Sequence, residues 1–192
     1  MATDGHFPAY VEIDYHSPYG THTATYNMRE VSSSGLGDAG TVETWAGGTL
    51  GVDEMVEDLI DALAGAVPST IVYDAYTVYR VPTVGASPQP IFTSAYSATG
   101  TETGLTGQAK AVQVTLSFRT EGFGQARVVV LDRPVDGNFG SFIDPSGDFA
   151  GVIAEFTDPT NAWAGADNTR PAAYTNTSIS LNRRLRRKYG MI

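Results

Sequence analysis

Residues 111–131, AVQVTLSFRTEGFGQARVVVL, contain the clearest structural signal in the chain. In the first half, apolar and polar side chains alternate, which places Val112, Val114, Leu116 and Phe118 on one face of a strand. A glycine-containing turn and a second run rich in β-branched residues follow directly. This arrangement is typical of a β-hairpin and predicts a fold built on antiparallel strands.

The N-terminal part of the chain repeats this pattern. Residues 7–16 alternate, with Val11, Ile13 and Tyr15 on one side and polar or charged residues on the other. The sequence SPYG at residues 17–20 is typical of a turn, and residues 21–31 predict the returning strand. Further strands are predicted at 41–45, 70–81, 91–98 and 173–181, irregular segments at 82–90, 99–107, 133–148 and 158–171, and either a strand or a short helix at 149–157.

One segment, residues 52–64, predicts an amphipathic helix. Its apolar residues recur at helical spacing and its acidic residues cover the opposite face. Asp53 is a candidate N-cap, and Gly65 and Pro68 mark the end. We therefore expect a mainly β, α+β fold, an antiparallel sheet or sandwich with this helix packed on a sheet. The length predicts a single β-rich domain at residues 1–182, followed by a tail at residues 183–192.

Charge is distributed unevenly along the chain. Five of the 12 Lys and Arg residues lie within residues 183–188, so residues 1–182 keep seven cations against all 21 acidic residues, a net charge of −14. A basic tail on an acidic body indicates docking on a negatively charged partner. The predicted interaction residues are Arg183, Arg184, Arg186, Arg187, Lys188 and Tyr189. Their candidate partners are a neighbouring copy, the acidic body itself, and a nucleic acid, which arginines would bind through its phosphates.

Metal and cysteine chemistry have little support. The chain has no Cys, which excludes disulfides, thiolate metal sites and cysteine catalysis. His16 and His22 flank the first turn and would form a weak metal site with Asp14, although polar positions on strands are the expected role. Residues 132–138 and 144–148 hold oxygen ligands suited to calcium, but their spacing does not match the twelve-residue EF-hand loop. We predict no metal and no cofactor.

No motif names a reaction. The candidates for a glycosidase-like carboxylate pair are Glu12, Asp14, Glu121, Asp132 and Glu155, but a chain with 21 acids yields such pairs by chance. Neither a nucleophile elbow nor a phosphate loop occurs, and residues 35–40, GLGDAG, precede no suitably placed helix. The sequence therefore predicts that the protein is not an enzyme and has no catalytic residue.

Several segments together indicate a family. They are residues 11–22 (VEIDYHSPYGTH), the helix at 53–63, residues 117–120 (SFRT), 128–132 (VVVLD), 161–163 (NAW) and 181–191 (LNRRLRRKYGM). In these segments the chain resembles small proteins encoded by bacteriophages and environmental viruses. The resemblance runs along most of the chain and carries no catalytic residue. It implies a viral origin and a structural role in the virion.

From these observations we expect a non-enzymatic, self-assembling virion protein that forms or decorates a capsid. Two alternatives remain open, a tail tube or tail-terminator subunit, and a carbohydrate-binding or glycoside-hydrolysing domain with Trp45 or Trp163 exposed for stacking on sugar. The expected partners are further copies and other virion proteins, with nucleic acid as an alternative partner of the tail. The sequence has no secretory signal at its N-terminus and no run of 18 apolar residues, so we expect synthesis in the host cytoplasm, location in the virion and no membrane partner.

Overall fold

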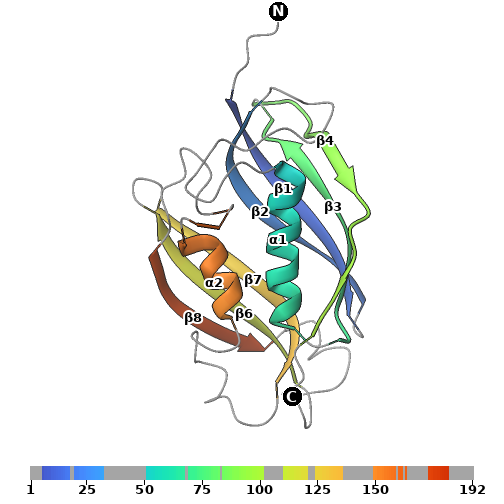
Figure 1. Cartoon of the computed structure of the whole chain (residues 1–192), viewed down its shortest axis with the longest axis vertical. Helices are drawn as coiled ribbons and strands as arrows, with labels where there is room; N and C mark the ends of the chain where they lie inside the picture. The colour runs from blue at the N-terminus through green and yellow to red at the C-terminus, as the bar shows by residue number, and fades with distance from the viewer. Residues whose placement is uncertain are drawn as a thin grey trace, which may run out of the picture.

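Two antiparallel sheets and two helices make up the described part of the protein (Figure 1). The computed structural model describes residues 6–17, 20–32, 51–67, 69–82, 84–101, 110–120, 124–135, 149–158, 160–161, 163 and 173–181. The predicted fold class, a mainly β architecture with an amphipathic helix packed on a sheet, is confirmed. The predicted strand at residues 41–45 lies outside the described residues.

The first sheet begins with the predicted N-terminal hairpin. Its strand order is β2-β1-β3-β4, and β5 also pairs with β3. The strands are β1 (His6–Ser17), β2 (Gly20–Ser32), β3 (Val72–Arg80), β4 (Gln89–Ser94) and β5 (Ala98–Thr99). The strand predicted at 91–98 is therefore wrong in its bounds, because two short strands with a gap between them occupy this region. Gly20 has a φ of +132°, which suits a residue without a Cβ at the point where the chain turns into β2.

The inner face of this sheet is apolar, as the alternation predicts. Val11, Ile13 and Tyr15 are buried on β1. Helix α1 (Val52–Gly65) covers this side of the sheet (Figure 1) and buries the entire predicted stripe. That stripe consists of Val52, Met55, Val56, Leu59, Ile60 and Leu63.

The predicted N-cap of α1 is wrong by two residues. Gly51 is the N-cap, and Asp53 lies within the first turn. The Gly51 N–H donates a hydrogen bond of 3.0 Å to Oε2 of Glu54, the third helical residue. This contact is half of a capping box and satisfies the backbone N–H of Gly51.

The second sheet contains the hairpin predicted at residues 111–131. It has the order β7-β6-β8, with β6 (Lys110–Thr120), β7 (Gly124–Val135) and β8 (Ala173–Leu181). Strand β7 continues through residues 133–135, which were predicted to be irregular; their pairing with β6 extends the strand despite Pro134. The segment at 149–157 is resolved in favour of a helix, α2 (Ala150–Thr157).

A chain of aromatic contacts joins the two sheets. Tyr26 on β2 meets the edge of Trp163 at 6.5 Å between ring centroids, and Trp163 meets Phe156 on α2 at 5.5 Å. Phe156 in turn stacks on Phe118 of β6 at 4.9 Å. Both sheets and both helices therefore contribute to a shared set of buried side chains. The boundary predicted between a domain and a tail at residue 182 lies outside the described residues.

Candidate interaction surfaces

The predicted interaction residues are not among those that the structure describes. Arg183, Arg184, Arg186, Arg187, Lys188 and Tyr189 all lie outside the described residues. The same holds for Trp45, for Glu121 and for most of the calcium candidate, at residues 136–148, and for the glycine-rich segment at 35–40. The predictions made for these residues remain predictions.

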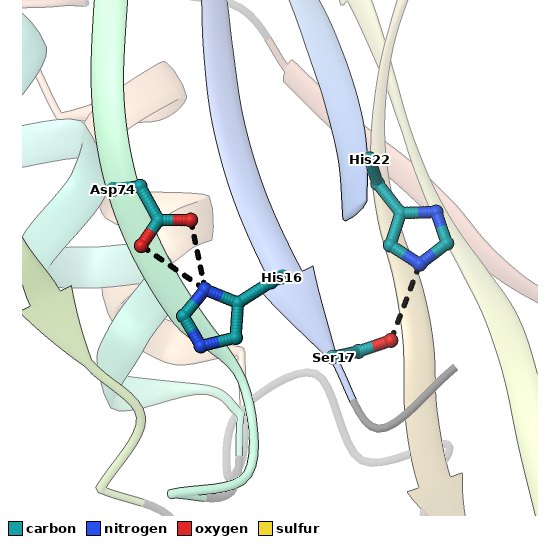
Figure 2. A network of polar contacts seen from close by, with 4 residues as sticks. All are labelled: His16, Ser17, His22 and Asp74. Carbon is teal, nitrogen blue, oxygen red and sulfur yellow. Dashed lines mark hydrogen bonds and ion pairs between the residues drawn. The ribbon is translucent and has the colours of Figure 1, made fainter. Parts of the chain in front are cut away.

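The two histidines of the first hairpin do not form a metal site. His16 pairs in register with Thr21, and His22 pairs with Tyr15, which points into the core. The two imidazoles consequently lie on opposite faces of the hairpin. His22 stacks on Tyr15 at 5.1 Å, and its Nε2 lies 3.2 Å from the Ser17 hydroxyl (Figure 2). Within the described residues, no group of three His, Asp or Glu side chains is arranged to hold a metal ion.

His16 instead contacts Asp74, a residue that the sequence analysis did not single out. Its Nδ1 lies 2.8 Å from Oδ2 of Asp74, and both side chains are roughly half exposed (Figure 2). The pairing of β1 with β3 shifts register between Asp14 and Tyr15, at the level of Ala75 and Tyr73, so Asp74 occupies the irregularity. Such a bulge re-aims a side chain. Strand alternation alone would not have predicted the contact.

The outer face of the first sheet is polar with one aromatic pair. The Thr23 hydroxyl donates to Oδ1 of Asp14 at 2.6 Å, and the hydroxyls of Thr77 and Thr93 lie 3.2 Å apart. Tyr10 and Tyr79 stack on each other at 5.1 Å with an angle of 13° between their rings. Each ring therefore covers one face of the other, which leaves less aromatic surface for stacking on a planar or sugar ligand.

Trp163 does not provide the exposed platform that the carbohydrate hypothesis required. Its relative exposure is 9%, and it packs between Tyr26 and Phe156 in the core. The tryptophan here joins the two sheets. The described residues therefore lack this signature of a sugar-binding site.

The exposed side of α1 forms an acidic surface, which we define as Glu54, Glu57, Asp58 and Asp61. Two tyrosines contact this surface, Tyr76 on β3 and Tyr96 in the connection between β4 and β5. The Tyr76 hydroxyl donates to Oε1 of Glu57 at 3.3 Å, and the Tyr96 hydroxyl donates to Oδ1 of Asp61 at 2.8 Å. The two contacts fix carboxylates on one side of the helix, which keeps negative charge concentrated there.

Partial burial, with the crowding of carboxylates as a second cause, raises proton affinity on this surface. Burial raises the pKa of Glu57, and the neighbouring carboxylates raise it further against the lowering effect of the Tyr76 hydrogen bond. Burial also raises the pKa of Asp58, with added repulsion from Asp61 and Glu54. A raised carboxylate pKa means that the ionised form is disfavoured where it stands. A cationic group placed on this surface would relieve that cost.

A further acid, Glu155, faces α1 from α2. Its Oε2 is out of contact with solvent and has no hydrogen-bond partner among the described residues. Burial, with repulsion from Asp58 and Asp158, raises the pKa of Glu155 to about 7. Such a value suits a general acid, but two of the partner carboxylates named by the glycosidase hypothesis, Glu12 and Asp14, are not beside it. Glu12 and Asp14 lie on β1, on the polar side of the first sheet, and α1 packs against the opposite side.

The connection between β3 and β4 frames an open cavity of about 290 Å³. Its lining consists of Arg80, Val81, Pro82, Ala86, Ser87 and Gln89. Arg80 is the one ionisable residue in this lining, so the cavity does not pair an acid with a base. Val84, in the same connection, is fully exposed.

Comparison of the chain with protein-family models, curated proteins and solved structures finds no significant match. The described helices are all too short or too polar to cross a membrane.

Proposed function

We propose that the protein is a non-enzymatic, self-assembling structural subunit of a bacteriophage virion, forming or decorating the capsid. The observation that supports this most directly is the acidic surface of α1 in a chain whose cations are concentrated in residues 183–188. The resemblance to phage proteins supplies the virion setting. The charges supply the means of association.

The physical argument rests on pairing partly buried, crowded carboxylates with cations. Ionised Glu57 and Asp58 are disfavoured in the isolated fold, as their raised pKa values indicate. An arginine-rich segment from another copy would bring cations to these carboxylates, and guanidinium groups bind carboxylates through two hydrogen bonds. A contact between one surface of a copy and a different surface of the next is heterologous, and it generates rings or helical arrays.

A tail tube or tail-terminator subunit is the second candidate. The observation in its favour is a sheet flanked by a long amphipathic helix, here α1 on the first sheet. Both candidates require association of identical copies, and both predict the same behaviour of the charged surfaces.

The test is a charge exchange followed by sedimentation velocity across a salt series. Association of the full chain should weaken with salt, because exposed charges are screened over about 8 Å at physiological ionic strength. Asp58→Lys should weaken it as strongly as deletion of residues 183–192, and Arg186→Glu should restore part of it in the Asp58→Lys background. Glu12→Lys, which makes the same charge change on the outer face of β1, is the matched control.

Three outcomes would contradict the proposal. A full chain that stays monomeric at high concentration refutes self-assembly. An assembly of unchanged size in the deletion variant, with loss of DNA binding, would assign the basic segment to nucleic acid. Unfolding of the deletion variant, seen as loss of its cooperative thermal transition, would show that this segment belongs to the core.

A further inference from the structure

Strand β2 is the terminal strand of the first sheet in the described part of the chain, and its composition is unusual for an edge. The order β2-β1-β3-β4 leaves one side of β2 without a paired strand in the described part of the chain. Every second residue of an edge strand turns its N–H and C=O groups away from the neighbouring strand. Such an edge is a template for adding another strand unless charge, proline or a bulge protects it.

The protective features are missing from most of β2. Residues 20–28, GTHTATYNM, contain no Asp, Glu, Lys, Arg or Pro, and the first bulge comes beyond them, between the pairings of Phe7 and Ala9. The other edges differ. Strand β4 carries Pro90, and β7 carries three charged residues and Pro134. Strand β8 is also uncharged, but one side of it pairs with β6 and α2 packs against it.

The side chains on the outer face of this edge suit a strand-to-strand contact. Thr21, Thr23, Thr25 and Asn27 are exposed and lie on one face at a spacing of two residues. Threonine is favoured in strands, and Thr–Thr pairs across strands contribute hydrogen bonds. On the inner face, Tyr26 and Met28 are buried, so the edge is anchored to the core.

We propose that β2 pairs with β2 of a second copy, antiparallel and about a two-fold axis, which joins two first sheets into one continuous sheet. This inference rests on the proposed function, since it names a second surface through which copies meet. The occupant is a second copy because self-pairing of residues 20–28 sets no like charges opposite each other, whereas the chain as a whole carries a net charge of −9. Two copies with this net charge repel each other least when they meet along an uncharged edge.

The nearest acids remain far enough apart in the joined sheet. Asp14 lies one strand inward and already accepts a hydrogen bond from Thr23. With Ala24 facing its own copy, Asp14 would be aligned with Glu12 of the second copy, because these residues pair with Thr23 and Thr25. The two side chains would be separated by three strand spacings, about 14 Å at about 4.8 Å each. This exceeds the screening length of about 8 Å at physiological ionic strength, so their repulsion is weak.

The register follows from the uncharged span. Self-pairing of residues 20–28 over their whole length is centred on Ala24, which then faces its own copy across the axis. Thr23 faces Thr25 of the second copy on the outer face. Directly opposed residues in antiparallel strands have Cα atoms about 4.5–5.5 Å apart, a separation that a disulfide spans.

The experiment uses the full chain, which has no native Cys to interfere. Ala24→Cys should form an intermolecular disulfide under mild oxidation, while the control Thr93→Cys, at an exposed position on β4, should not. A second variant, Thr23→Lys with Thr25→Lys, places like charges opposite each other at two exposed positions. It should keep a normal thermal melt and weaken the dimer at least tenfold in sedimentation equilibrium.

The outcomes separate this inference from the proposed function. The inference is supported if the full chain dimerises, Ala24→Cys forms the cross-link and the lysine pair weakens the dimer. Association that persists in the lysine variant, with no cross-link at Ala24→Cys, overturns the β2 contact and leaves self-assembly through another surface. A full chain that remains monomeric and fails to cross-link overturns both.

Discussion

Replacement of Glu155 by Gln should stabilise the protein at neutral and alkaline pH and leave it nearly unchanged under mildly acidic conditions. Glutamine keeps the shape of the side chain and removes its charge. The Oε2 atom of Glu155 lies out of solvent between α2 and α1, without a hydrogen-bond partner in the described structure. The groups that act on it are Asp58 on α1 and Asp158 at the end of α2, and β8, which also packs on α2, contains no charged residue.

The magnitude follows from the difference in proton affinity between the two states. The pKa of Glu155 rises from 4.5 to about 7 on folding, so the unfolded chain loses this proton first as pH increases. Folding stability therefore falls across that interval and stays lower above it. The full displacement would correspond to about 3 kcal/mol. Because the side chain is only partly buried, water screens the charges, and we expect about 1–2 kcal/mol.

The assay is urea denaturation of the parent and of Glu155→Gln at several pH values between about pH 5 and about pH 8.5. The difference in free energy of unfolding should be small at the acidic end and grow through the interval up to about pH 7.5. Glu12→Gln, on the outer face of β1, is the control and should change stability by less than about 0.5 kcal/mol throughout. An equal difference at both ends of the series would refute the argument, because it would show that the carboxyl charge is not what destabilises the fold.

Two further substitutions test the architecture. Leu59→Ala, at a fully buried position of the α1 stripe, should cost about 2–5 kcal/mol in a denaturant melt; a loss below 1 kcal/mol would contradict the packing of α1 on the sheet. Gly20→Ala should cost about 1–2 kcal/mol, because φ is +132° there. Gly65→Ala is its matched control, because both sites have open space for a Cβ but Gly65 is helical. The Gly65 substitution should be neutral or stabilising by up to about 1 kcal/mol. Equal costs at both glycines would refute the role of φ.

Local patterns were enough to predict the first hairpin and α1. In β1 the alternation that buries Val11 and Ile13 lies within a few consecutive residues, and the stripe of α1 repeats at helical spacing. Each pattern arises because one face of a single element packs against an apolar layer, so the spacing of apolar residues in the sequence reveals it. The same reasoning was undecided for α2, because eight residues with a mostly apolar composition fit a buried strand as well as a helix.

The details of the candidate surfaces could not be predicted because they arise from contacts between distant residues. The pairing of His16 with Asp74 depends on a register shift between β1 and β3. The raised pKa of Glu155 requires α2 to lie beside α1. The acidic face of α1, in contrast, was evident from helical spacing alone.

The two contacts proposed here have different symmetry, and this difference decides what they build together. Pairing of β2 with β2 uses the same surface on both copies, so it closes after two chains. Docking of a basic segment on the acidic surface of α1 uses two different surfaces. Each copy can therefore bind the next, and the contact extends to rings or helical arrays instead of ending at two chains. Backbone hydrogen bonds hold the first contact and exposed charges hold the second, so salt weakens the second far more. An uncharged edge combined with a charged helix face therefore favours dimers that join into larger assemblies at low salt. At high salt the larger assemblies should separate and the dimers should persist.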